Sequence, residues 1–193
     1  MVNLLGATPE ADKQDFKTFV TDPGFLPDEI KLYPCALVAG TQLVQKYREG
    51  AWQPYAKDEL VDVLVQDALN TPPYVRISRM IRDISATDIL VGNKHTNLRQ
   101  MVEQELAAKD VASRVQEIRF REINQQQVSA AELTLQDFVY TTAVSDEHFL
   151  QWVTADNKIA GFCRLSLPHW DKLTSGVCDV AANELLVQPG QAM

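Results

Sequence analysis

The apolar residues of this 193-residue chain change their spacing near residue 114, and this change constrains the fold more than any other feature. Before that point they recur at helical spacing, as in residues 57–70, where Leu60 and Leu64 lie on one stripe. After it, β-rich segments such as residues 137–145 take over. Helix–strand alternation followed by antiparallel strands predicts an α+β fold, or two modules joined in one chain.

The first part predicts several helices separated by short strands. Proline suits the first turn of a helix but not its interior, so Pro9 marks one helix start and Pro72 lies beyond the end of another. The expected helices are residues 9–20, residues 41–50 with Thr41 as cap and Gly50 as stop, residues 57–70 and residues 96–110. Residues 30–38 predict a buried strand. Residues 75–84 fit a strand by their β-branched residues or a helix by their arginine spacing, and a strand that runs into a helical turn satisfies both.

The second part predicts an antiparallel sheet. Residues 115–123 read VQEIRFREI, an alternation typical of a strand that presents Ile118 and Phe120 on one face and Arg119 and Arg121 on the other. Further strands are expected within residues 137–145, 148–167 and 180–188, with a hairpin turn at residues 155–158.

One window of this acidic chain is basic. Residues 74–99 hold five Arg or Lys residues against two Asp residues, a net charge of +3 in a chain of net charge −8. Arg76, Arg79 and Arg82 recur every third residue, which would line one face of a helix, whereas in a regular strand they would alternate between faces. A solvated charged face explains the spacing about as well as a binding surface does. Because arginine suits bidentate contact with phosphate, nucleic acid is the favoured partner.

Composition argues against several kinds of protein. No apolar run approaches the ~18–20 residues of a membrane span, and the N-terminus lacks the basic start and apolar core of a secretory signal, so a soluble, cytoplasmic protein without membrane contact is expected. Cys35, Cys163 and Cys178 are far apart, and no cysteines or histidines have metal-ligand spacing, so no metal site is predicted.

The sequence also offers no catalytic constellation. It has no glycine-rich phosphate loop. Ser145, Asp146 and His148 are too close in sequence to converge as a nucleophile and its base. We therefore assign no catalytic residues.

Eight short segments, taken in order, resemble the Elongator catalytic subunit family, and its bacterial and archaeal single-chain members most closely. They read NLLGATPEADKQDF, DEIKLYPC, GAWQPY, RISRMIRDI, GNKHTNLRQ, IRFREI, EHFLQWV and AGFCRLSLP, and the resemblance covers roughly residues 3 to 193. Members of that family combine a radical S-adenosylmethionine barrel with a lysine-acetyltransferase-like domain that uses acetyl-CoA. Together these modify the wobble uridine of tRNA.

The resemblance implies a central fragment of such an enzyme. Residues 1–112 would be the C-terminal portion of the barrel, an α/β partial barrel with the basic strip, and residues 113–193 a linker and an incomplete, antiparallel acetyltransferase-like domain. The family's cofactors are S-adenosylmethionine with an iron–sulfur cluster, and acetyl-CoA. The cluster cysteines and the pyrophosphate loop are missing from this sequence, so no cofactor is predicted for the chain itself. The family's zinc site is not expected either, since Arg114, Gln116 and Phe120 occupy the matching neighbourhood.

The resemblance also implies a partner, tRNA, and a set of candidate backbone-contacting residues. These nucleic-acid-binding candidates are Arg76, Arg79, Arg82, Lys94, His95 and Arg99 of the basic strip, and Arg119 and Arg121 of the linker. The alternative is a structural or protein-interaction module that a partner chain completes, or that self-associates through exposed strand edges. A stand-alone acyltransferase is a weaker third possibility.

Overall fold

The computed structural model describes residues 1–81, 84–124, 127–170 and 187–189. The chain divides into two compact units, which we describe separately. The first comprises residues 1–20 and 27–117, and the second comprises residues 21–26 and 118–193. The prediction of a mixed helix and strand fold is confirmed, whereas the expected boundary between residues 112 and 113 stays a prediction.

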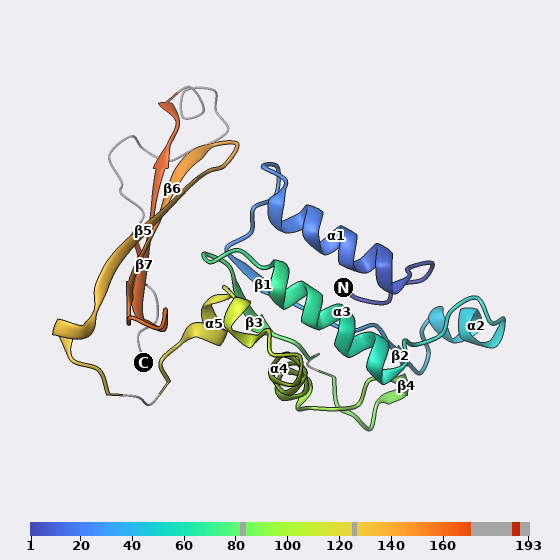
Figure 1. The fold of residues 1–193 in the computed structure, drawn as a ribbon. Coiled ribbons are helices and arrows are strands. Elements are labelled where there is room, and N and C mark those ends of the chain that lie inside the picture. The colour runs from blue at the N-terminus through green and yellow to red at the C-terminus, as the bar shows by residue number, and fades with distance from the viewer. Residues whose placement is uncertain (82–83, 125–126, 171–186, 190–193) are drawn as a thin grey trace. The chain divides into compact units, whose positions relative to one another are not determined.

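The first unit alternates helices with short strands (Figure 1). Its elements are α1 (Pro9–Thr21), β1 (Glu29–Lys31), β2 (Ala36–Val38), α2 (Leu43–Arg48), α3 (Lys57–Asn70), β3 (Arg76–Arg79), β4 (Ile89–Gly92), α4 (Leu98–Ala108) and the 3-10 helix η1 (Ala112–Arg114). The helix start predicted at Pro9 is confirmed, and the Thr8 hydroxyl caps this helix by accepting a hydrogen bond from the Ala11 N–H at 3.2 Å.

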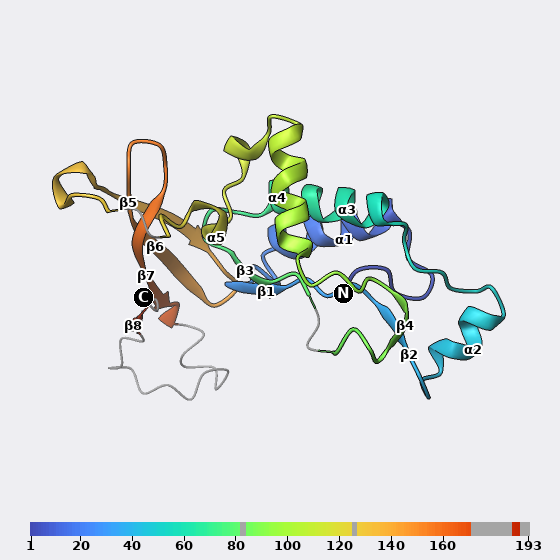
Figure 2. The same cartoon turned by 90° about the horizontal axis from the view of Figure 1, so that it is seen from below.

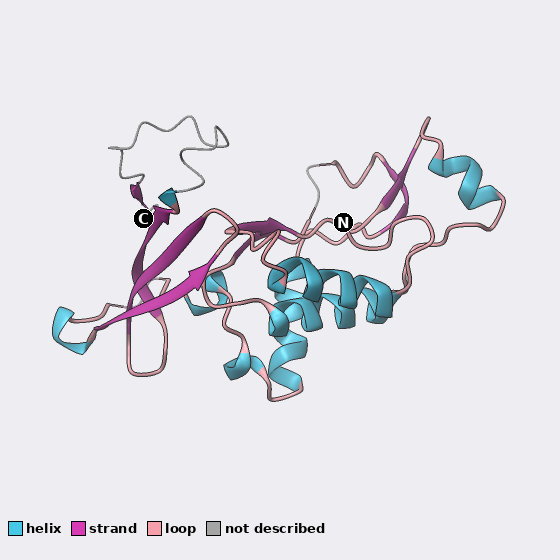
Figure 3. Cartoon of the chain, turned by 90° about the horizontal axis from the view of Figure 1, so that it is seen from above, coloured by secondary structure: helices cyan, strands magenta, loops and turns pink. Residues whose placement is uncertain are grey.

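The strands of this unit form two small sheets. β1 pairs in parallel with β3, and β2 pairs antiparallel with β4, so the single strand expected over residues 30–38 is two strands separated by a break. The break contains Pro34, which has no N–H to donate to a sheet. Helices α1, α3 and α4 lie on one side of β1 and β3 (Figure 3).

Helix α3 supplies much of the core of the first unit. Seven of its residues are buried, among them Val63, Leu64 and Val65, which have no exposed surface. Its first turn is fixed by Glu59, whose carboxylate accepts a hydrogen bond from the Ala56 N–H at 2.8 Å. It lies beside α1 (Figures 1 and 2), and the Lys13 ammonium reaches the Asp62 carboxylate at 2.7 Å between them.

A smaller apolar cluster lies where β2 and α2 meet. Cys35, Leu37 and Trp52 are buried there, and side chains of α2 pack against them. Gly50 ends α2 as predicted, with a positive φ of 73° that glycine adopts without strain. Thr41 does not cap this helix, because the N-cap residue is Gln42 and the Thr41 hydroxyl donates instead to the Val38 carbonyl.

The second unit is an antiparallel sheet preceded by short helical turns. Its elements are α5 (Ile118–Arg121), η2 (Ala130–Glu132), β5 (Thr134–Thr141), β6 (Ser145–Val153), β7 (Ile159–Pro168) and β8 (Val187–Pro189), and the strand order is β5-β6-β7-β8. The hairpin turn predicted between the second and third of these strands is confirmed, with Asn157 at a positive φ of 63°. Most of the strand expected over residues 180–188 lies outside the described residues.

The strand predicted over residues 115–123 is wrong. Residues Ile118–Arg121 form the helical turn α5, and only Glu122 makes a β-bridge, to Ile159. Glu117, Ile118 and Arg121 are all buried, which a two-residue alternation cannot produce. Tertiary packing of these three side chains overrides the local strand pattern.

Candidate nucleic-acid interface

The arginines at the start of the basic window lie on a strand, not on a helix. Residues Arg76–Arg79 form β3, so the prediction of a helical face shared by Arg76 and Arg79 is wrong. The alternative prediction of a strand is the correct one for these residues. Arg82 lies outside the described residues.

A β-bulge nevertheless brings these two arginines to one side. Arg76 pairs with Glu29 and Arg79 pairs with Lys31, so Ser78 is an extra residue in β3. Because Glu29 and Lys31 are two residues apart on β1, they share a face, and their partners lie on that same face. The face is turned to solvent: Glu29, Lys31 and Arg79 are exposed and Arg76 is half-buried, whereas Ile30 and Ile77 between them are buried.

Lys94 and His95 lie in the segment that joins β4 to α4, and both are exposed. The Asn93 carboxamide fixes the backbone here by accepting a hydrogen bond from the His95 N–H and donating one to the His95 carbonyl. These residues border a small hollow of about 40 Å³ that Ile81 also lines. The fold therefore brings the segment with Lys94 back to the residues that directly follow β3.

Arg99, in contrast, is an internal contact of the fold. Its guanidinium donates a hydrogen bond to the Ile77 carbonyl and lies 3.8 Å from the carboxylate of Glu117, which has no exposed surface. Glu117 also accepts a hydrogen bond from the Ile77 N–H at 2.5 Å. This buried carboxylate thus ties the end of the first unit to β3 and to the first turn of α4.

The two linker arginines belong to the second unit and differ from each other. Arg119 is exposed. Arg121 is only 4% exposed and donates a hydrogen bond to the Asn157 side chain at 3.1 Å, across to the β6–β7 turn. Because Arg121 is buried, we do not propose it as a phosphate contact.

The first unit contains a buried polar group that was not predicted from the sequence. The Asp12 carboxylate accepts hydrogen bonds from the Asn3 N–H at 2.7 Å and the Tyr55 hydroxyl at 2.8 Å. Burial and the Asp12 contact raise the pKa of Tyr55 well above its usual range. Asp67 on α3 is 2% exposed, and burial, reinforced by the nearby Asp12 charge, raises its pKa to about 8. The signal was present, since Asp67 lies one helical turn after Leu64 on the apolar stripe.

The described residues contain no cluster of three or more side chains that could hold a metal ion. Cys35 is buried in the apolar cluster of the first unit, and Cys163 lies on β7 of the second unit. Within the described part of the chain, no helix is long and apolar enough to cross a membrane.

Comparison with known proteins decides the family. Residues 27–108 match the Radical_SAM C-terminal domain. The chain is 36% identical over 171 residues to a tRNA uridine(34) acetyltransferase of Dehalococcoides mccartyi, a match that covers 87% of this chain. It is 30% identical over 172 residues to human Elongator complex protein 3, covering 86% of this chain. Over most of its length, the chain is therefore a homologue of Elp3 proteins.

The structure of a relative agrees with this assignment. The fold matches that of Elp3 from the archaeon Methanocaldococcus infernus with a TM-score of 0.79 and 31% identity, over 86% of this chain and 40% of that one. The resemblance stated from the eight short segments is thereby confirmed. The chain spans only 37% of the Dehalococcoides protein and 31% of the human one, so the activity of a whole Elp3 protein does not transfer to it directly.

Proposed function

We propose that this chain is an Elp3-type region that contacts tRNA through the exposed part of its basic window and has no catalysis of its own. The observation that carries the proposal is the bulge in β3, because it gathers Arg76 and Arg79 on one solvent-facing side. Relatives named for action on tRNA uridine 34 make tRNA the favoured polyanion.

The contacts we propose are to phosphate rather than to bases. Arg79, Lys94 and His95 are exposed and Arg76 is half-exposed, while the whole chain carries a net charge of −8. A local cationic surface on an anionic chain attracts a polyanion at that surface and repels it elsewhere. Arg119 is a further candidate in the second unit, and Arg82 remains one from sequence alone. Arg99 is already engaged by Glu117, so its proposed role is to position the strand that carries Arg76 and Arg79.

We do not assign the chemical steps of the tRNA modification to this chain. A radical SAM family implies S-adenosylmethionine and an iron–sulfur cluster, which supply radical chemistry when bound. Cys35, Cys163 and Cys178 lack the close spacing of cluster-binding cysteines, so we assign this chain no step of the reaction. A role on tRNA is consistent with the expected cytoplasmic location.

Filter binding of tRNA to the full chain tests the proposal. The Arg79→Glu/Lys94→Glu variant should lose affinity by at least about tenfold at low salt, because two phosphate contacts become repulsive. The matched control is Arg48→Glu/Lys57→Glu, which has the same change in net charge at two exposed residues of the same unit, outside the basic window.

The control should bind within about twofold of the wild-type chain if the surface contact is local, since exposed charges beyond a Debye length are screened. An equal loss of tRNA affinity in both double variants would mean that affinity depends on the net charge of the chain and not on the position of these residues. No loss in either would exclude a contact through Arg79 and Lys94.

A further inference from the structure

The bulge in β3 changes which side chain lies opposite Lys31. A regular pairing that continued from Ile30 and Ile77 would place Ser78 there, whereas the shifted register places Arg79 there. Neighbouring strands lie only about 4.8 Å apart, so the bulge sets two cationic side chains beside each other. Lys31 was not among the binding residues predicted from the sequence.

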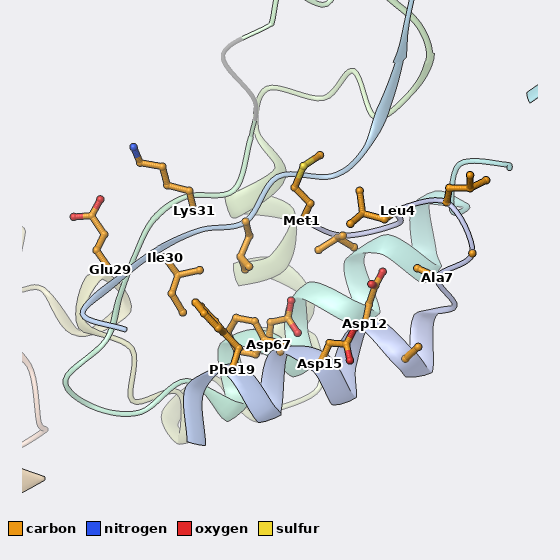
Figure 4. A pocket seen from close by; sticks show the side chains of 16 residues that line it. Met1, Leu4, Ala7, Asp12, Asp15, Phe19, Glu29, Ile30, Lys31 and Asp67 are labelled. Atoms are coloured by element: carbon orange, nitrogen blue, oxygen red, sulfur yellow. The ribbon is translucent and has the colours of Figure 1, made fainter. Parts of the chain in front are cut away.

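The two cross-strand positions on this face differ in their charges. Figure 4 shows Glu29 and Lys31 pointing away from Ile30, to the other side of β1. Glu29 lies opposite Arg76, so the charges at that position are opposite. Lys31 lies opposite Arg79, so the charges at this position are alike, and like charges directly opposite each other destabilise a sheet. An anion bound between Lys31 and Arg79 would remove this repulsion.

The fold itself supplies no anion to Lys31. Among the described residues, the Lys31 ammonium forms no ion pair and no hydrogen bond. The nearest acidic residue on the same face of β1, Glu29, is two residues away, which is about 6.6 Å along a strand. Exclusion of water from this face would strengthen the repulsion, because the effective dielectric constant falls. The pair therefore favours an anion whether the face is open or covered.

Backbone contacts hold the bulge in place. Before it, the Arg76 N–H donates to the Asp28 carbonyl at 3.0 Å. After it, the Leu32 N–H donates to the Arg79 carbonyl at 2.8 Å. Within it, the Ser78 hydroxyl donates to the backbone of β1 at 3.4 Å. The like-charged pair is thus a fixed feature of the fold, and local rules are most often broken in this way at functional sites.

We propose that Lys31 and Arg79 together form a subsite for one phosphate of an RNA backbone. The proposal rests on the tRNA contact proposed above and adds Lys31 to it. A phosphodiester has two unesterified oxygens, so one can bind the Lys31 ammonium while the other accepts from the Arg79 guanidinium. One bound phosphate thus offsets the repulsion between both cations. Because Glu29 lowers the positive charge beside Arg76, Arg76 contributes less to RNA binding than Lys31 does.

Filter binding of tRNA to the full chain tests the subsite. Lys31→Gln and Arg79→Gln should each lower affinity about three- to tenfold at low salt, because each removes a contact to phosphate. The double variant should lose clearly less than the product of the two losses, since either single variant already forfeits the relief of repulsion. Lys31→Gln combined with Lys94→Gln should lose the product within about twofold, because Lys94 contacts a different phosphate.

Thermal unfolding without RNA gives a readout that a merely structural role would not give. Lys31→Gln should raise the unfolding midpoint by about 1–3 °C at low salt, because it removes the repulsion with Arg79. The control is Arg48→Gln, which makes the same change in net charge at an exposed residue of α2. Arg48→Gln should leave tRNA affinity within about twofold of the wild-type value and should not raise the midpoint.

A titration with inorganic phosphate separates RNA from a free anion as the ligand. At constant ionic strength, about 1 mM phosphate should leave the unfolding midpoint of the wild-type chain unchanged, because a free phosphate gains this one contact without the others that RNA makes. If phosphate raises the midpoint of the wild-type chain but not that of Lys31→Gln, the subsite takes a free phosphate and its assignment to RNA is wrong.

Three results would overturn the subsite alone. One is a tRNA affinity that falls in Arg79→Gln but not in Lys31→Gln, in which case the proposed tRNA contact stands without Lys31. Another is a loss in the Lys31→Gln/Arg79→Gln variant equal to the product of the single losses. The third is a midpoint that Lys31→Gln does not raise. If the wild-type chain binds no tRNA, the proposed function itself fails, and the subsite fails with it.

Discussion

Helix α3 and strand β5 are both rich in apolar residues, yet the fold treats them in opposite ways. Seven of the 14 residues of α3 are buried, whereas none of the eight residues of β5 is buried. On β5, Leu135 and Val139 lie on one face and Phe138 on the other, and all three are exposed. An apolar pattern therefore indicates the type of element, while its burial depends on what the rest of the fold places against it.

The largest expected effect contrasts these two elements directly. Leu64→Ala on α3 should lower the free energy of unfolding by about 2–5 kcal/mol, because it leaves a cavity at a side chain with no exposed surface. Leu135→Ala on β5, at a side chain 50% exposed, should cost less than about 1 kcal/mol. Urea unfolding of both variants measures the difference, and similar losses would mean that β5 is covered in solution.

A second prediction concerns the carboxylate that joins β3 to α4. Glu117→Gln should destabilise the first unit by about 3 kcal/mol, because the Arg99 guanidinium loses its buried counter-charge. Glu103→Gln, on an exposed face of α4, is the control and should change stability by less than about 0.5 kcal/mol. If Glu117→Gln is as mild as its control, Arg99 is available for other contacts, and its assignment as a positioning residue is wrong.

A third prediction uses the raised pKa of Asp67. The folded state holds its proton up to about pH 8, whereas the unfolded chain releases it near its ordinary value of 3.8. Between these values the folded state binds more protons, so its stability falls as pH rises, by up to about 1.4 kcal/mol per pH unit from this group. Asp67→Asn cannot ionise and should remove this slope. Urea unfolding at pH 5, 6 and 7 measures it, and equal slopes in both proteins would contradict the assigned burial.

The smallest effect is expected at the surface between α1 and α3. Lys13→Gln removes the 2.7 Å contact with Asp62, which with Lys109 holds the pKa of that carboxyl below its usual value. The expected loss is only about 0.5 kcal/mol, because exposed ion pairs are weak and screened by salt. Lys57→Gln at the start of α3 is the control. A loss as large as that for Leu64→Ala would show that the helices depend on this ion pair rather than on their apolar faces.

The sequence predicts those parts of the fold that local chemistry decides. Pro9 and Pro72 delimit α1 and α3, Gly50 ends α2, and Asn157 forms the turn of the β6–β7 hairpin, each through its own backbone preference. The α5 turn was missed because Glu117, at its start, is placed by a contact with Ile77, 40 residues away. No local pattern encodes a contact of that range.

The candidate site was only partly predictable for the same reason. The excess of cations in residues 74–99 is visible in the sequence, and so is the exposure of Lys94 in a polar loop. The bulge at Ser78 places Arg79 on the same face as Arg76. It follows from the register with β1, so it cannot be predicted from the residues of β3 alone. The contacts of Arg99 and Arg121 likewise depend on partners distant in sequence.

The most direct test of the tRNA assignment is the salt dependence of tRNA affinity, measured with the wild-type chain from 50 to 200 mM salt. Three or four phosphate contacts should give a slope of about −2 to −4 in log affinity against log salt. In Arg79→Glu/Lys94→Glu the slope should be shallower by about 1.4 to 1.8, since each of the two lost contacts removes about 0.7–0.9. A flat line for the wild-type chain, or an unchanged slope in this variant, would contradict the account.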